Sequence, residues 1–444
     1  MRRTIFVIFI SFVLFAVTST GCNYREEVPS VELPALSSSG NLSTDPVELE
    51  IWSYYSGWEP AIKFFEKKYP NVSVKVRIFE SDAYVSAYQQ AIIDGVTPDI
   101  MVSDSEQFGH FTAINGLEDL LDYGADKYRA NFSEHLWTSN LSYNETKLIG
   151  FPVSTSPMMT YYRADIMEQY GFPTDPEQLG KFMELPKNWM EIAKALKKDE
   201  IYITQWPTEV VQIFDSTQGL FDAHFNFSRN NDNFLNAINI AKQVNDNAFA
   251  ASMDVWTLSG AQAVKDGKIA MLYLGTWGAA QIEAWAPESA GKWRETRLPF
   301  NQYGWANSTN LMMPSASRNK EWAWKFIEFI VTEWSEQVEG VSVPAYIPAR
   351  SNSKKLARES DFYGGQKLYS LHESLVQKMK EFKSTPIDVQ ARKIWRDQIN
   401  IGIERNKGAE VILNQTEHTL FTNLSEEITI LKNNYPGLLK AVVD

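Results

Sequence analysis

The fold of this chain is decided by residues 47–102, which read VELEIWSYYSGWEPAIKFFEKKYPNVSVKVRIFESDAYVSAYQQAIIDGVTPDIMV. Hydrophobic residues alternate with glutamates over 47–51, and this period of two predicts a β-strand. Pro60 stands where a helix can begin, and apolar residues then recur at helical spacing up to Tyr69. A second alternating stretch over 72–78 predicts a second strand.

The next part of the same stretch predicts a third strand. A helical pattern over 84–93 leads through Gly95 and Pro98 into the apolar run 100–102. The order is β-α-β-α-β, so we expect an α/β protein with a parallel sheet covered by helices. Ligands of such sheets bind beyond the carboxyl ends of the strands. The loops at 53–58 and 103–107 are therefore candidate binding segments.

The composition is that of a globular protein with an acidic surface. The chain has 444 residues, 44% of them hydrophobic and 22% charged, and its length favours two or more lobes. Its formal net charge of -13 argues against a nucleic-acid partner. The 14 Trp and 19 Tyr suit stacking on sugar rings, although large aromatic side chains are more often buried in cores.

Residues 1–21 have the layout of a secretory signal peptide. Arg2 and Arg3 precede an almost continuous apolar run over 5–17, and small residues follow. This run of about 13 residues is too short to span a bilayer as a helix, which needs about 20.

The only cysteine of the chain, Cys22, stands directly after this segment. The pair Gly21-Cys22 resembles the lipobox of bacterial lipoproteins, in which cleavage leaves a cysteine that carries a lipid; here Ser19 replaces the usual leucine. We expect Cys22 to be lipidated and residues 22–46, rich in Ser and Pro, to form a flexible tether. A plain signal peptide with an incidental cysteine is the alternative.

A series of short motifs follows in a fixed order along the chain. They are FFEKKYPNV (64–72), TPDI (97–100), NGLEDL (115–120), KLIGFP (147–152), YYRAD (161–165), PKNWMEI (186–192), DGKIAM (266–271), GTW (275–277) and NKEWAWKFI (319–327). Each motif alone is weak. Together they resemble the family 1 extracellular solute-binding proteins, which include maltose-binding protein.

The resemblance implies a fold and a function. The fold is of the periplasmic-binding-protein type II, with two α/β lobes joined by a hinge and a ligand cleft between them. Lobe one is expected at 47–153 plus 303–340, and lobe two at 154–302 plus 341–444. The function is that of the extracellular binding subunit of an ABC importer. Such a subunit, held by its lipid outside the cytoplasmic membrane, binds a carbohydrate, expected to be an oligosaccharide, and delivers it to membrane permease subunits.

Two tryptophans and one acid are candidate ligand-binding residues by the resemblance. Trp277 falls on the tryptophan that commonly stacks on sugar in this family. Trp395 has the place of a stacking tryptophan of maltose-binding protein, and Glu106 falls on a hydroxyl-binding acid. Burial in the core is the alternative for both tryptophans, and a solvated loop charge is the alternative for Glu106.

Further candidates come from the predicted loops. Asp104 and Gln107 flank Glu106 after the third strand and offer hydrogen bonds to sugar hydroxyls. In the aromatic run after the first strand we choose Tyr54 and Trp58 as a sugar platform. Arg350 is a candidate partner for a charged substituent, or else the cap of a helix.

Other classes of protein lack support in the sequence. No phosphate-binding Gly-x-x-x-x-Gly-Lys-Ser/Thr loop is present, so the importer's ATPase is expected on a separate chain. We expect no cofactor and no metal, because the five histidines are spread widely and no His-Glu-x-x-His motif occurs. A secreted glycoside hydrolase, which would need two opposed carboxylates, and a passive glycan-binding surface protein are the alternatives to a transport subunit that is not an enzyme.

Overall fold

The structure is a computed structural model that describes residues 45–338 and 343–434. The expected signal peptide, Cys22 and most of the expected tether lie outside the described residues. In the part of the chain that is described, no helix combines the length and the apolar character that crossing a membrane requires.

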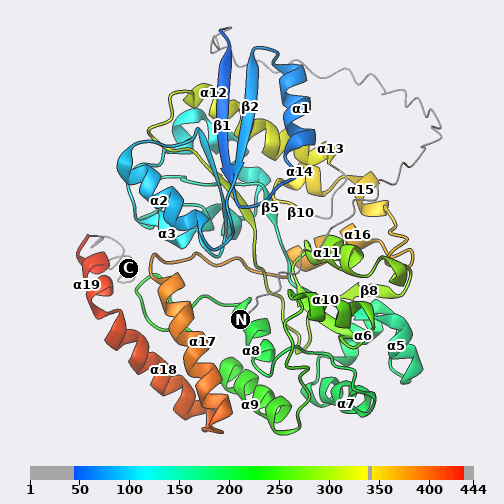
Figure 1. Ribbon diagram of the computed structural model, residues 1–444. Helices are drawn as coiled ribbons and strands as arrows, with labels where there is room; N and C mark the ends of the chain where they lie inside the picture. Colours follow the sequence, from blue (N-terminus) through cyan, green and yellow to red (C-terminus); the bar gives the residue numbers. More distant parts are fainter. Residues whose placement is uncertain (1–44, 339–342, 435–444) are drawn as a thin grey trace, which may run out of the picture. The chain divides into compact units, whose positions relative to one another are not determined.

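The first sheet begins as the sequence predicts. The strands β1 (Val47–Ser53), β2 (Val72–Ile78) and β3 (Ile100–Asp104) are parallel, and β1 lies between the other two. The helices α1 (Glu59–Lys68) and α2 (Tyr84–Asp94) connect them, as Figure 1 shows in blue. The predicted β-α-β-α-β order is confirmed.

Two strands from later in the chain complete this sheet. The order is β2-β1-β3-β9-β4, with β9 (Thr309–Met312) antiparallel to both β3 and β4 (Phe151–Pro152). The helix α12 (Lys320–Phe329) packs its aromatic stripe on α1, where the ring centroids of Phe65 and Phe326 are 4.9 Å apart. Residues far apart in sequence thus share one hydrophobic core.

A second, antiparallel sheet has the order β7-β6-β8. Its strands are β6 (Met159–Arg163), β7 (Met271–Leu274) and β8 (Trp293–Thr296), and nearly every residue in them is buried. The chain passes from the first sheet to the second through 153–158 and returns through 297–308. A short pair, β5 (Ser154–Thr155) with β10 (Val343–Pro344), lies on the first of these passages.

Helices cover the second sheet and form most of the C-terminal part. The longest are α9 (Asp232–Asp246), α17 (Asp388–Glu404) and α18 (Ala409–Asn423), which pack on one another (Figure 1). The other α-helices are α3 (Gly109–Thr112), α4 (Glu134–Ser139), α5 (Ala164–Gln169), α6 (Pro176–Phe182), α7 (Pro186–Leu196), α8 (Glu209–Asp215), α10 (Leu258–Lys265), α11 (Gly278–Trp285), α13 (Ser335–Gln337), α14 (Ile347–Arg350), α15 (Ser353–Ala357), α16 (Leu368–Val376) and α19 (Ser425–Asn434). Short 3-10 helices cover Leu120–Tyr123, Ala125–Asn131, Lys197–Asp199 and Pro287–Ser289, and a π-helical turn covers Ile330–Trp334.

Candidate functional site

A cavity of about 320 Å³ lies beyond the carboxyl end of β3. Its walls come from both sheets and from the C-terminal helices: the loops after β3 and before β9, the end of β7, the helix α8 and one face of α17. The residues that line it are Ser105, Glu106, Met158, Gln212, Asp215, Ser216, Leu220, Arg229, Tyr273, Trp277, Trp305, Ala306, Asn307, Phe382, Ser384, Asp388, Arg392 and Arg396. The wall thus combines aromatic rings with charged and polar groups.

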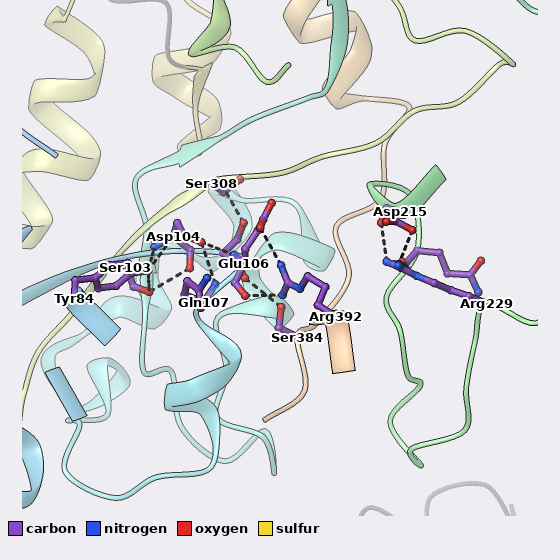
Figure 2. A network of polar contacts seen from close by, with 12 residues as sticks. Tyr84, Ser103, Asp104, Glu106, Gln107, Asp215, Arg229, Ser308, Ser384 and Arg392 are labelled. Atoms are coloured by element: carbon purple, nitrogen blue, oxygen red, sulfur yellow. Dashed lines mark hydrogen bonds and ion pairs between the residues drawn. The ribbon is translucent and has the colours of Figure 1, made fainter. Parts of the chain in front are cut away.

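One wall is the polar face of α17. Asp388, Arg392 and Arg396 line the cavity and are four residues apart, a spacing that places them on one side of a helix. Arg392 reaches across to the loop after β3, where its guanidinium donates to the Glu106 carboxylate at 3.0 Å and to the Glu106 carbonyl oxygen at 2.6 Å (Figure 2). This ion pair joins the first sheet to the C-terminal helices.

The segment before α17 is hydrogen-bonded to the same loop after β3. The Ser384 hydroxyl donates to the Ser105 carbonyl oxygen at 3.2 Å. The backbones also approach closely here, since a Cβ on Gly109 would lie 2.5 Å from the Thr385 carbonyl oxygen. Glycine is therefore required at 109, because a side chain would push the two segments apart.

Asp104 shapes the loop that presents Glu106. Its carboxylate accepts the backbone N–H groups of Glu106 and Gln107 at 2.8 and 3.0 Å and the Tyr84 hydroxyl at 2.7 Å. Burial, and next the neighbouring charge of Glu106, raises the pKa of Asp104 to about 6. The Asp104 carboxylate thus stabilises the turn and already accepts hydrogen bonds from three groups of the protein.

A second ion pair lies on the side of the cavity formed around α8. Asp215 binds Arg229 at 2.7 Å, and the Trp395 indole N–H donates to both Asp215 carboxylate oxygens at 3.0 and 3.1 Å. The Arg229 guanidinium also lies 5.1 Å from the Trp395 ring centroid. Burial raises the pKa of Asp215, while the Arg229 charge opposes this effect. Figure 2 shows this pair together with the Glu106–Arg392 network.

The aromatic part of the wall is formed by Tyr273, Trp277, Trp305 and Phe382. Trp277 is half-buried just after β7, and a Cβ on Gly275 would lie 2.8 Å from its indole nitrogen. Trp305 packs edge-on against Phe382, with ring centroids 5.6 Å apart. The indole N–H groups of both tryptophans are buried and have no hydrogen-bond partner among the described residues.

Of the residues chosen from the sequence, Trp277 and Glu106 line this cavity. Trp395 does not, because it lies on the buried stripe of α17 and packs on Phe227 and Phe234. Arg350 is buried and forms an ion pair with Glu373 at 2.6 Å, so its charge is already compensated.

The aromatic run after β1 folds on itself and is not part of the cavity lining either. The buried Trp58 stacks on Tyr55 and donates its indole N–H to the Ser53 hydroxyl at 3.0 Å. Tyr54 stacks on Tyr84 with centroids 5.1 Å apart. Asp104 and Gln107 form the turn beside the cavity but are also absent from its lining.

Sequence reasoning missed most of the polar wall. Asp215 and Arg229 lie at a helix end and in a loop, where no local pattern marks a functional residue. Trp305 is buried and lines the cavity as well. The four-residue spacing of Asp388, Arg392 and Arg396 was the one usable signal, because it places three charges on a single helix face.

The carboxylates that line the cavity are held by groups of the protein itself. Each lining carboxylate has its own partner: Glu106 has Arg392, Asp215 has Arg229, and Asp388 accepts the Thr385 hydroxyl at 2.6 Å. Over the residues that the structure describes, no group of three or more His, Cys, Asp or Glu side chains is placed to hold a metal ion.

The chain is similar to proteins that bind solutes outside the cell. A lactose-binding protein of Rhizobium radiobacter is 24% identical over 339 residues, which cover 68% of this chain and 78% of that protein. Two solved structures match with a TM-score of about 0.7. The binding protein of Bifidobacterium animalis subsp. lactis in complex with β-1,6-galactobiose has a TM-score of 0.71 and 18% identity, covering 86% of this chain and 98% of the other. The lacto-N-biose-binding protein of Bifidobacterium longum has a TM-score of 0.70 and 15% identity, covering 88% and 98%.

These structural matches show the fold, which is of the periplasmic-binding-protein type II, with two α/β lobes, a hinge and a ligand cleft. The model of the bacterial extracellular solute-binding proteins matches residues 52–334, well over half of the chain. This match contains the second sheet, the two passages between the sheets and the first sheet apart from most of β1 (Val47–Ser53). The chain therefore belongs to the family of bacterial extracellular solute-binding proteins.

Proposed function

We propose that this protein is the binding subunit of an ABC importer that captures a neutral oligosaccharide and delivers it to membrane permease subunits. The observation that carries the proposal is the cavity wall, in which Trp277, Trp305 and Phe382 lie beside paired polar groups. Sugar rings need this combination, because their C–H faces pack on aromatic rings and their hydroxyls need hydrogen-bond partners.

The charges of the cavity favour a neutral ligand. Three arginines and three carboxylates line it, and Arg392 and Arg229 are bound to Glu106 and Asp215. An anionic ligand would have to compete with these carboxylates for their arginines, and separating the buried Arg229 from Asp215 is costly. The sugars named for the lactose-binding relative and for the two sugar-bound structures support a carbohydrate.

Binding without catalysis follows from the same pairs. A glycoside hydrolase needs one carboxylic acid free to protonate the leaving group and a second carboxylate facing the sugar. Glu106, Asp215 and Asp388 are instead held by hydrogen bonds within the protein. A passive glycan-binding surface protein would need no cavity between two lobes.

We place the lobes at 47–153 plus 303–340 and at 154–302 plus 341–444. With these boundaries Glu106 and Arg392 belong to different lobes, so their ion pair bridges the cleft. A ligand that contacts both lobes shifts the population toward the closed form. The closed form is then the one that docks on the permease.

Anchoring by a lipid on Cys22, after removal of residues 1–21, completes the proposal. The pair Gly21-Cys22 supports it. Mass spectrometry of the membrane-extracted protein is expected to find a diacylglyceryl cysteine at the N-terminus. An unmodified N-terminus elsewhere, or a Cys22→Ala variant that fractionates like the wild type, would exclude this anchor.

The function is tested with a panel of sugars. We expect a saturable rise in melting temperature with neutral oligosaccharides, since a ligand that binds only the native state stabilises it. Calorimetry then measures the affinity, and chromatography of the incubated sugar checks for turnover. Shortened products would identify an enzyme, and tight binding of a glycerol phosphate with no binding of any glycan would refute the proposed ligand class.

A further inference from the structure

Trp256 is an exposed tryptophan at the edge of the aromatic wall. Its exposed fraction is 54%, although tryptophan is one of the residues that folding usually covers. Its ring centroid lies 5.5 Å from that of Trp277, which lines the cavity, with an angle of 38° between the ring planes. On another side it contacts Trp285 at 5.0 Å in an edge-on arrangement. The aromatic surface thus continues from the cavity wall to the outside.

The backbone that carries Trp256 is fixed by short-range hydrogen bonds. The Trp256 N–H donates to the Asp254 carboxylate at 2.9 Å, and the Thr257 hydroxyl donates to the Asp254 carbonyl oxygen at 2.7 Å. Thr257 also caps α10 by accepting the Gly260 N–H at 3.1 Å. Gly260 has no room for a side chain, because a Cβ there would lie 1.9 Å from the Asp254 carbonyl oxygen.

A buried network ties this loop to the helix that forms the cavity wall. The Glu209 carboxylate, 5% exposed, accepts the Gln205 backbone and side-chain N–H groups at 2.6 and 2.7 Å. The Gln205 side-chain amide oxygen in turn accepts the Val255 N–H at 3.1 Å. Glu209 begins α8, which places Gln212 and Asp215 in the cavity. Trp256 is therefore held at a set position relative to the cavity, as a preorganised binding group must be.

We propose that Trp256 forms an outer subsite that stacks on a sugar ring lying outside the cavity, so that the ligand is an oligosaccharide longer than the cavity. This inference rests on the proposed function and adds the length of the ligand. The cavity volume of about 320 Å³ is at the lower end of the range for ligand sites. A longer chain leaves the cavity past Trp277, and Trp256 is the next aromatic surface it meets.

The test is calorimetry on the full chain with neutral glucans, galactans and xylans of two, three and four rings. In the wild type the affinity is expected to rise with length. Trp256→Ala is expected to bind the two-ring sugar as the wild type does and to lose about three- to tenfold in affinity for the longest sugar, the usual range for an aromatic stacking contact. Trp256→Phe, which keeps a flat ring, is expected to retain most of this affinity.

Leu258→Ala is the matched control. Leu258 is 94% exposed and lies two residues further on, so its removal takes away a neighbouring apolar side chain without touching the aromatic surface. We expect it to bind every length as the wild type does. Melting curves are expected to show that both alanine variants stay folded, because both side chains are largely exposed in the folded protein.

The outcomes separate this inference from the proposed function. A wild type that binds no sugar of the panel refutes both. A wild type that binds sugars, with Trp256→Ala losing affinity equally at every length or at none, refutes the outer subsite alone. Unchanged sugar binding with slower uptake in cells would assign Trp256 to a contact with a protein partner and also overturn the subsite.

Discussion

The substitution Trp395→Phe tests whether Trp395 supports the cavity wall or stacks on the ligand. The substitution keeps an aromatic ring but removes the indole N–H that donates to Asp215. A hydrogen bond to a charged group contributes about 1.5–3 kcal/mol, and the smaller ring leaves a void that costs about 1 kcal/mol more. We therefore expect the free energy of unfolding to fall by about 2.5–4 kcal/mol.

The assay is urea unfolding at neutral pH without ligand, followed by calorimetry with the best sugar. Trp189→Phe is the matched control, since Trp189 is equally buried but donates to the neutral Tyr273 hydroxyl at 2.9 Å. A hydrogen bond between neutral groups contributes less, about 0.5–1.5 kcal/mol, so we expect a smaller loss of stability there. Unchanged stability of Trp395→Phe together with a tenfold loss of affinity would place the indole against the ligand and refute this assignment.

Three further predictions concern the cavity wall. Arg392→Gln removes a partly exposed ion pair with Glu106, so we expect stability to fall by at most about 1 kcal/mol and sugar affinity to fall about two- to fivefold; a rise in affinity would mean that Arg392 competes with the ligand. Burial raises the pKa of Asp104 to about 6, against about 3.9 in an unfolded chain, so the folded state binds the proton more tightly. The free energy of unfolding should then fall as the pH rises from about 4 through about 6, by on the order of 3 kcal/mol from this group. Asp104→Asn should remove that part of the pH dependence. A difference in urea midpoint between this variant and the wild type that stays constant at every pH would contradict the raised pKa. Gly275→Ala would bring a Cβ to 2.3 Å from the Ser156 hydroxyl, so we expect the free energy of unfolding to fall by about 1–3 kcal/mol. Adding Ser156→Ala should restore part of this stability. An unchanged free energy of unfolding in Gly275→Ala would contradict the close contact at this strand end.

The sequence predicts the first sheet well because its strands carry their own signal. The alternation over 47–51 and 72–78 matches β1 and β2, and the loop after β3 leads directly to Glu106 at the cavity. The joining of β9 and β4 to this sheet has no such local signal, since pairing between distant strands depends on the whole fold.

The cavity shows the same division between local and distant information. Trp277 and Trp395 are both candidates through the family resemblance, and of the two only Trp277 lines the cavity. Trp395 was chosen by its place in the family, yet Ala391, Trp395 and Ile399 form a buried helical stripe that the spacing alone would have indicated. Asp215 and Arg229 meet only in three dimensions, so no sequence pattern pairs them.

The pairing of charges around the cavity has a consequence for where the protein can work. Dissolved salt weakens the attraction between a site and a ligand only when both carry net charge. The arginines and carboxylates that line this cavity are equal in number, and Glu106–Arg392 and Asp215–Arg229 are direct ion pairs. The affinity for an uncharged ligand should therefore be nearly the same at low and at high salt concentration. The salt concentration outside a cell can vary, so this property suits a protein exposed to that medium.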